Sequence, residues 1–159
     1  IIRPKKVLEL GTFTGYSALC LAEGLAPNGE IHTIDKNEEL IEIQSQFFNR
    51  SAYGSQIYQH TGSALEIIKK LNQNYDLVFI DADKHNYVNY FKLLIDKINC
   101  GGVIISDNVL WSGKVIKPID EADISTKILL KYNKLLKEDP RLETVLLPIR
   151  DGLTLSIKK

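Results

Sequence analysis

The chain has 159 residues, enough for one sizeable core but few for two domains. Hydrophobic residues make up 44% and charged residues 25%, a globular mixture that excludes a disordered or fibrous protein. Lys and Arg balance Asp and Glu at 20 each, so no net positive field favours nucleic acid or an anionic membrane. No apolar run approaches the roughly 18 residues of a membrane span. We therefore predict a single domain over residues 1–159 with neither nucleic acid nor membrane as a partner.

The two cysteines, Cys20 and Cys100, form neither a CxxC pair nor a disulfide framework. Free cysteines are usually buried, so we predict that both are buried and reduced, which suits a reducing compartment and a cytoplasmic location. The chain starts without Met, at Ile1, directly before a predicted strand. We therefore expect a preceding segment, and the lack of a targeting signal excludes no location.

Short apolar strands alternate with helical segments along the chain. In order, the pattern predicts strands at 7–10, 31–35, 56–59, 76–81 and 103–106, and helices at 17–26, 38–52, 63–71, 87–98 and 124–137. Asn37 is a suitable N-cap for the second helix. A Cys-Gly-Gly turn is predicted at 100–102, and two final strands, 142–147 and 153–157, form a hairpin around Arg150-Asp151-Gly152.

This alternation predicts a doubly wound α/β sandwich. Strand–helix–strand units cross over in the right-handed sense and build a mostly parallel sheet that is covered on both faces. The continuous apolar run at 76–81 is typical of a strand that is buried on both faces. The closing hairpin requires at least one antiparallel strand near an edge.

Acidic residues gather where the predicted strands end: Glu9, Asp35, Asp81 and Asp107. Ligands of open α/β sheets bind at this edge. One explanation is that each carboxylate merely caps the next helix, and for Asp35 alone both explanations are equally good. Four carboxylates at one edge favour a functional site, because like charges in proximity require compensation.

The first loop, Glu9–Ser17, has the pattern E-x-G-x-x-x-G. Its glycines allow a sharp turn and a close backbone approach to a ligand. A dinucleotide loop would read G-x-G-x-x-G, and Glu9 would repel a pyrophosphate but attract the amino group of an amino-acid moiety. Asp35 is suitably placed to accept hydrogen bonds from ribose hydroxyls. The combination favours S-adenosylmethionine over NAD.

Asp81, Asp107 and Asn108 offer three oxygen ligands without a thiolate. Oxygen ligation suits a hard cation such as Mg²⁺. Turn preference explains Asp107 and Asn108 equally well, so the residues alone leave the metal site open.

Four runs spread over almost the whole chain carry a family resemblance: VLELGTFTGYSALCLA, IDADKHNY, GGVIISDNVLWSGKV and DPRLETVLLPIRDGLTLSIKK. They resemble the caffeoyl-CoA and catechol O-methyltransferase family. The resemblance implies a class I methyltransferase fold, a Rossmann-like three-layer sandwich with a seven-stranded sheet. It also implies S-adenosylmethionine as the donor, a divalent cation (Mg²⁺, with Ca²⁺ and Mn²⁺ as alternatives), a homodimer, and an aromatic diol or hydroxycinnamoyl thioester as the acceptor.

The resemblance also implies site residues. The metal ligands are Asp81, Asp107 and Asn108. The donor-binding residues are Glu9, Gly11, Thr12, Ser17, Asp35, Ala64 and Asp83, with Tyr16 and Ser63 as additions. Two departures matter: the family's helical segment before the first strand does not appear in this sequence, and Ser112 stands where plant members have Asn.

For the chemistry we predict that Lys84 is the general base, beside Asp81, and that a chelated cation orients the acceptor diol and lowers its pKa. The alternative for Lys84 is an exposed lysine at the start of a helix. Trp111, the single tryptophan, is a candidate wall for a planar acceptor, and packing within its loop explains it equally well. We expect His32 and His60 to be structural and His85 to be solvated.

Two alternatives to an O-methyltransferase remain at this point. One is an NAD-dependent dehydrogenase, which the missing third glycine and Glu9 disfavour. The other is a nucleotide- or metabolite-binding module without catalytic activity.

Overall fold

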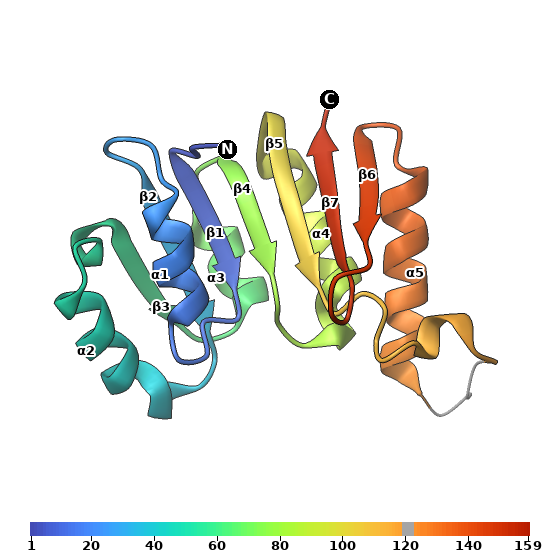
Figure 1. Ribbon diagram of the computed structural model, residues 1–159, viewed down its shortest axis with the longest axis horizontal. Coiled ribbons are helices and arrows are strands. Elements are labelled where there is room, and N and C mark those ends of the chain that lie inside the picture. Colours follow the sequence, from blue (N-terminus) through green and yellow to red (C-terminus); the bar gives the residue numbers. More distant parts are fainter. Residues whose placement is uncertain (119–122) are drawn as a thin grey trace.

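The computed structural model describes residues 1–118 and 123–159. One seven-stranded sheet runs through it in the order β3-β2-β1-β4-β5-β7-β6 (Figure 1). The strands are β1 (Lys6–Leu10), β2 (Glu30–Asp35), β3 (Ile57–Thr61), β4 (Tyr75–Ile80), β5 (Ile98–Asp107), β6 (Leu142–Leu147) and β7 (Leu153–Lys158). The first five are parallel, and β7 runs antiparallel to both β5 and β6. This confirms the predicted mostly parallel sheet with an antiparallel C-terminal hairpin.

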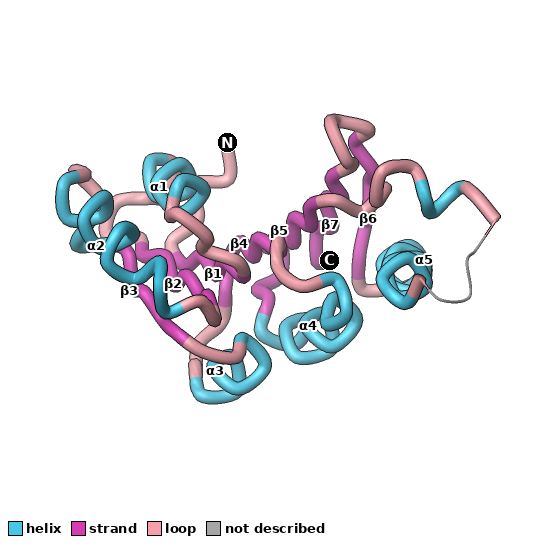
Figure 2. Tube along the Cα trace, turned by 90° about the horizontal axis from the view of Figure 1, so that it is seen from below, coloured by secondary structure: helices cyan, strands magenta, loops and turns pink. Residues whose placement is uncertain are grey.

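Helices cover both faces of the sheet (Figure 2). They are α1 (Tyr16–Glu23), α2 (Ile41–Arg50), α3 (Ala64–Lys70), α4 (Tyr87–Leu94) and α5 (Ile124–Glu138). Helices α1 and α2 lie on one face, and α3, α4 and α5 lie on the other. The apolar core accordingly has two parts, a larger one beneath α3–α5 and a smaller one beneath α1 and α2. Among the described residues no helix is long and apolar enough to cross a membrane.

The predicted elements differ from the structure mainly at their ends. Asn37 caps the second helix as predicted, because its side chain accepts a hydrogen bond from the Glu39 N–H at 3.0 Å. That helix opens with a 3₁₀ turn, Glu38–Leu40, and ends at Arg50. The third strand extends to Thr61 because it pairs with β2 along its whole length.

The prediction around residues 98–102 was wrong. Helix α4 ends at Leu94 and a 3₁₀ turn, Ile95–Lys97, continues it, so the predicted helical segment is one residue too long. The residues expected to form the turn, and Ile98 before them, belong to β5. Ile98 is buried and pairs with Tyr75 of β4, and the register then shifts before Leu77 pairs with Val103. Gly101, with φ +77°, lies within that irregularity. A Gly-Gly pair that usually marks a turn is here an irregular start of a strand.

Both cysteines are exposed, which corrects the prediction that they are buried. Helix α1 buries Ala18 and Ala22, which are one turn apart, so Cys20 between them points to solvent. Cys100 lies beside Gly101 in the irregular part of β5. Their positions on the elements outweigh the general tendency of free cysteines to be buried.

Candidate active site

A cavity of about 710 Å³ opens at the carboxyl ends of β1, β2, β3 and β4. The segments after these four strands line it: residues 11–14, 16–17, 34–36, 62–64 and 81–83, together with Asn86 and Tyr90. β1 is the point where the sheet order reverses, with β2 on one side and β4 on the other. The cavity therefore lies where ligands of open α/β sheets bind.

The loop after β1 fits tightly between its neighbours. The Gly11 N–H donates to the Ile34 carbonyl at 2.9 Å, and Gly11 has φ +99°. A Cβ atom on Gly11 would lie 2.0 Å from the Asp81 carbonyl oxygen, closer than any real contact. Gly15, with φ +89°, caps the start of α1. The two glycines of the predicted pattern are thus required by backbone conformation and by space.

Eight of the nine residues predicted to bind the donor line this cavity: Gly11, Thr12, Tyr16, Ser17, Asp35, Ser63, Ala64 and Asp83. The Asp35 carboxylate accepts hydrogen bonds from the Phe13 N–H at 2.7 Å and the Asn37 N–H at 2.9 Å. It thereby fixes the loop after β1 against the end of β2.

Glu9, the ninth residue, is fully buried and does not line the cavity. Its Oε2 accepts a hydrogen bond from the Thr33 hydroxyl at 2.5 Å, and its Oε1 has no hydrogen-bond partner among the described residues. Burial raises the pKa of Glu9 to about 7, while the hydroxyl groups of Ser17 and Thr33 act in the opposite direction. A carboxyl group with a free oxygen and a pKa this close to neutrality is typical of functional sites.

Lys84 is buried, with 8% of its side chain exposed, which corrects the alternative of an exposed lysine. Its Nζ lies 2.5 Å from the Tyr87 hydroxyl, 2.9 Å from Asn108 Oδ1 and 3.4 Å from Asp81 Oδ1. Burial lowers the pKa of Lys84, and the negative charges of Asp81, Asp107 and Asp151 act against this. The ends of β4 and β5 therefore converge on one buried cation.

The segment after β5 has an unusual backbone. Asn108, Trp111 and Ser112 have φ angles of +58°, +49° and +54°. The Asp151 carboxylate, from the turn between β6 and β7, accepts a hydrogen bond from the Ser112 N–H at 2.5 Å. The Trp111 ring centroid lies 5.9 Å from Lys84 Nζ, and the ring packs against the larger core. The indole N–H is buried and has no hydrogen-bond partner among residues 1–118 and 123–159.

The predicted metal ligands, Asp81, Asp107 and Asn108, lie at the ends of β4 and β5. The described residues contain no group of three or more His, Cys, Asp or Glu side chains suited to a metal ion. The predicted set has two carboxylates and an amide. Asp81 and Asn108 oxygens already share one cation, the Lys84 ammonium, and the Asp107 carboxylate acts on the same charge. An oxygen-only donor set around a point that holds a cation fits a hard divalent ion.

Sequence reasoning missed three residues around this site. Asn86 and Tyr90 line the cavity and hold Asp83, whose carboxylate accepts hydrogen bonds from the Asn86 amide at 2.6 Å and the Tyr90 hydroxyl at 2.5 Å. They follow Asp83 by three and seven positions, so a helical repeat after Asp83 was the available signal. The third is Tyr87, which contacts Lys84.

Comparison with known proteins identifies the family. A sequence model described as "O-methyltransferase" matches residues 1–159. The chain is 39% identical to caffeoyl-CoA O-methyltransferase 2 of Eucalyptus globulus over 166 residues, which cover 98% of this chain and 67% of the relative. It is 38% identical to caffeoyl-CoA O-methyltransferase of Petroselinum crispum, over 98% of this chain and 69% of the relative. The chain belongs to the O-methyltransferase family. The alternatives of a dehydrogenase and of a non-catalytic module are not favoured.

Solved structures agree with this O-methyltransferase assignment. The O-methyltransferase from Bacillus cereus, in complex with SAH, superimposes with a TM-score of 0.94 at 29% identity, over 99% of this chain and 76% of that one. TomG from Streptomyces achromogenes, in complex with SAM, gives 0.93 at 28% identity, over 99% and 74%. The Rossmann-like methyltransferase fold and the enzyme class predicted from the sequence are confirmed.

Proposed function

We propose that this O-methyltransferase transfers a methyl group from S-adenosylmethionine to a hydroxyl of a catechol-like or hydroxycinnamoyl-type acceptor, with a divalent cation chelating the acceptor diol. One observation carries the proposal: Asp81 lines the cavity and also contacts the buried Lys84 ammonium. A donor in the cavity and an acceptor near Lys84 would therefore meet at one residue.

The cavity supports the donor half. The complexes of two similar enzymes with SAM and SAH support S-adenosylmethionine as the donor. We assign the ribose hydroxyls to Asp35 and the amino group of the donor to Glu9, whose Oε1 bonds no group in the described part of the chain. Gly11 would let the backbone approach the ligand closely. Hydrogen bonds from Asn86 and Tyr90 fix the position of the Asp83 carboxylate.

The cluster around Lys84 supports the acceptor half. Asp81, Asp107 and Asn108 would hold the cation. When bound, the cation would lower the pKa of the acceptor hydroxyl and fix the orientation of the acceptor. Lys84 would take the acceptor proton, since its burial disfavours the charged form. Trp111 would form one wall of the acceptor site. The caffeoyl-CoA relatives support a hydroxycinnamoyl-type small molecule as the acceptor.

The test is methyl transfer from S-adenosylmethionine to caffeoyl-CoA and to catechol, each with Mg²⁺ and with a chelator. We expect product with Mg²⁺ and a loss of activity with the chelator. Lys84→Ala should lower kcat by about 100-fold or more, the usual contribution of general acid–base catalysis. Lys69→Ala is the control, because Lys69 pairs with Glu66 on the exposed face of α3. Full activity of Lys84→Ala would remove Lys84 from the mechanism, and binding of NAD⁺ in place of S-adenosylhomocysteine would contradict the whole assignment.

We also carry forward three predictions from the sequence: a homodimer, a cytoplasmic location and a single domain over residues 1–159. The face of β5, β7 and β6 that is opposite α4 and α5 carries no helix of the described residues (Figure 2). Val145 and Ile157 are 52% and 49% exposed there. Analytical ultracentrifugation would test the dimer, and a single monomeric species at all concentrations would contradict it.

A further inference from the structure

We propose that Tyr87 is a positioning residue for Lys84. Its hydroxyl would hold the Lys84 amino group between the ends of β4 and β5 during methyl transfer. This inference rests on the proposed function, because it assigns Tyr87 a role only if Lys84 takes part in the reaction.

The contact between the two side chains is close and enclosed. Lys84 opens the 3₁₀ turn Lys84–Asn86, and Tyr87 is the first residue of α4, one turn later. The Tyr87 hydroxyl lies 2.5 Å from Lys84 Nζ, and the Tyr87 ring centroid lies 4.6 Å from it. Tyr87 is fully buried and Lys84 is nearly so. Water therefore competes little for this hydrogen bond.

The direction of the hydrogen bond follows from the available protons. A phenol has one proton to donate. The Tyr87 hydroxyl can donate it to the Asp107 carbonyl at 3.0 Å or to the Ile80 carbonyl at 3.2 Å. These carbonyls belong to the last residues of β5 and β4. The hydroxyl therefore accepts a hydrogen bond from Lys84 Nζ and links it to a backbone carbonyl at the end of β4 or of β5.

The other two acceptors around Nζ show why the hydroxyl matters. They are Asp81 Oδ1 and Asn108 Oδ1, and both residues are proposed ligands of the cation. A cation held by those oxygens would compete with Lys84 for them. Tyr87 is the remaining side chain that the described residues offer to Nζ as a hydrogen-bond acceptor. Its hydroxyl is thus the contact that can hold Lys84 near the acceptor while a cation is bound.

The variant Tyr87→Phe removes the hydroxyl and keeps the ring. Tyr132→Phe is a matched control, because Tyr132 is also fully buried, packs edge-on against Tyr87 at 5.2 Å and bonds Ser106 in place of Lys84. We expect Tyr87→Phe to lower kcat about tenfold, the scale of one hydrogen bond to a charged group, with an unchanged KM for S-adenosylmethionine. Tyr132→Phe should keep the wild-type kcat. In a Lys84→Ala background, Tyr87→Phe should have no further effect.

A second measurement does not depend on activity. A hydrogen-bonded, buried lysine ammonium should give a slowly exchanging ¹H–¹⁵N signal, identified by its loss in Lys84→Ala. We expect the signal to be lost or broadened in Tyr87→Phe and kept in Tyr132→Phe. An unchanged signal in Tyr87→Phe would overturn the proposal, as would additive effects of Tyr87→Phe and Lys84→Ala on kcat. Failure of the wild-type enzyme to methylate any acceptor would sink the proposed function, but the ammonium signal would still decide whether Tyr87 holds Lys84.

Discussion

At the scale of single residues, Glu9 shows how burial changes the chemistry of a carboxyl group. It lies within β1 among apolar neighbours, with one oxygen bonded to Thr33 and the other without a partner in the part of the chain that the structure describes. Because burial raises the pKa of Glu9 to about 7, its charged form appears only near neutral pH. A ligand ammonium would favour that charged form.

The corresponding prediction concerns donor binding. If Glu9 pairs with the amino group of the donor, the affinity for S-adenosylhomocysteine should fall as the pH falls from 8 to 6, through the pKa of about 7. Glu9→Gln should bind about 10- to 100-fold more weakly at pH 8, as expected for one charged hydrogen bond, and with a flatter pH profile. Calorimetric titration measures both effects. Glu30→Gln is the control, since Glu30 is a carboxylate of β2 that does not line the cavity. Wild-type affinity of Glu9→Gln at pH 8 would refute this role.

At the scale of elements, the loop after β1 and the end of β4 are built to fit each other. Any side chain at Gly11 would collide with the Asp81 carbonyl, and the residue after that carbonyl begins the segment that reaches Lys84. The proposed donor side and the proposed acceptor side of the site therefore meet at a close backbone approach between Gly11 and Asp81.

We predict that Gly11→Ala lowers both stability and activity. The positive φ alone costs roughly 1–3 kcal/mol in a residue other than glycine, and the collision with Asp81 adds to this cost. Gly113→Ala is a matched control, because Gly113 has φ +73° but no atom of the described residues lies within 4 Å of the added Cβ. Urea unfolding should place the midpoint of Gly11→Ala below that of Gly113→Ala. Equal midpoints would show that the collision is relieved without cost.

The β6–β7 turn supports the segment that carries Asn108. The Leu110 N–H donates to the Asp151 carbonyl at 2.9 Å, and the Asp151 carboxylate accepts from the Ser112 N–H. This support matters because Asn108 and its neighbours have left-handed backbone conformations.

We predict that Asp151→Ala raises the KM for the acceptor and leaves binding of S-adenosylhomocysteine unchanged, because the turn does not touch the cavity. Asp151→Asn keeps an acceptor oxygen for the Ser112 N–H and should show a smaller effect. Steady-state kinetics with both substrates varied separates these outcomes. An equal loss of donor affinity in Asp151→Ala would mean that the turn acts on the whole site.

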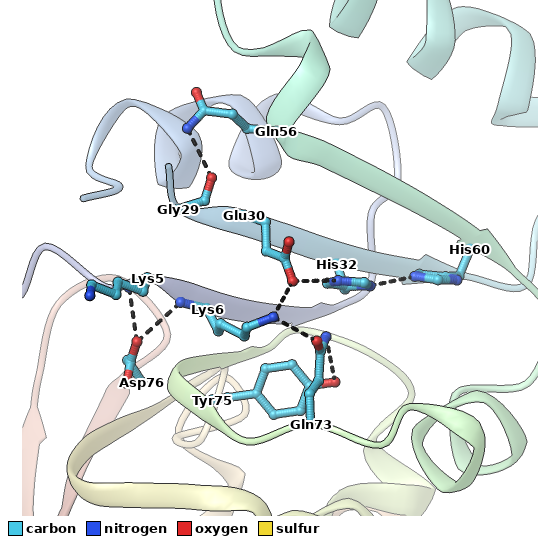
Figure 3. A network of polar contacts seen from close by, with 10 residues as sticks. All are labelled: Lys5, Lys6, Gly29, Glu30, His32, Gln56, His60, Gln73, Tyr75 and Asp76. Atoms are coloured by element: carbon cyan, nitrogen blue, oxygen red, sulfur yellow. Dashed lines mark hydrogen bonds and ion pairs between the residues drawn. The ribbon is translucent and has the colours of Figure 1, made fainter. Parts of the chain in front are cut away.

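At the scale of the whole molecule, two groups respond to acid in opposite directions. A chain of polar contacts crosses three strands, from Lys6 on β1 through Glu30 and His32 on β2 to His60 on β3 (Figure 3). His32 Nε2 faces Glu30 and His32 Nδ1 lies 2.8 Å from His60 Nε2. The two rings therefore hydrogen-bond each other in their neutral forms. These contacts give the pair no catalytic or binding role. The expectation that His32 and His60 are structural stays a prediction.

The pair should make the protein less stable in mild acid. Burial lowers the pKa of both His32 and His60 below the ordinary value of 6.5. The stability that the neutral rings contribute is complete above pH 6.5 and is lost as the pH falls through their lowered pKa values. Glu9 acts the other way: its pKa is raised from 4.5 to about 7, so the stability it contributes is present below 4.5 and is lost as the pH rises through 7.

The two opposing contributions can be separated by substitution. Between pH 6.5 and 5, unfolding free energy should fall less steeply in His60→Gln than in the wild type, because the amide can still donate to His32 but does not titrate. Over the same range Glu9→Gln should show a steeper fall, since it lacks the compensating carboxyl group. Chemical denaturation at several pH values measures these slopes. Substitution of the exposed His85 should leave the slope as in the wild type, and an identical slope in His60→Gln would refute the contribution of the pair.

Local patterns in the sequence are sufficient to predict the alternation of strands and helices, the antiparallel hairpin and the edge where the cavity lies. These depend on local patterns: apolar runs, the Asn37 cap and glycines such as Gly11, whose conformation few other residues can adopt. Acidic residues at strand ends were visible in the same way. The family resemblance then added expectations that those patterns left open. One of them is the set of metal ligands, because turn preference alone could explain Asp107 and Asn108.

Which side chains are buried, and which of them contact one another, depends on the folded arrangement of the elements. Lys84 is enclosed because Tyr87 and Asn108, from different elements, close around it, and the Glu9 carboxyl group is buried within the sheet, where it accepts a hydrogen bond from Thr33 of β2. The start of β5 at Ile98 and the exposure of Cys20 likewise follow from neighbours distant in the chain. Burial and pairing are properties of the assembled sheet, so local sequence patterns could not specify them.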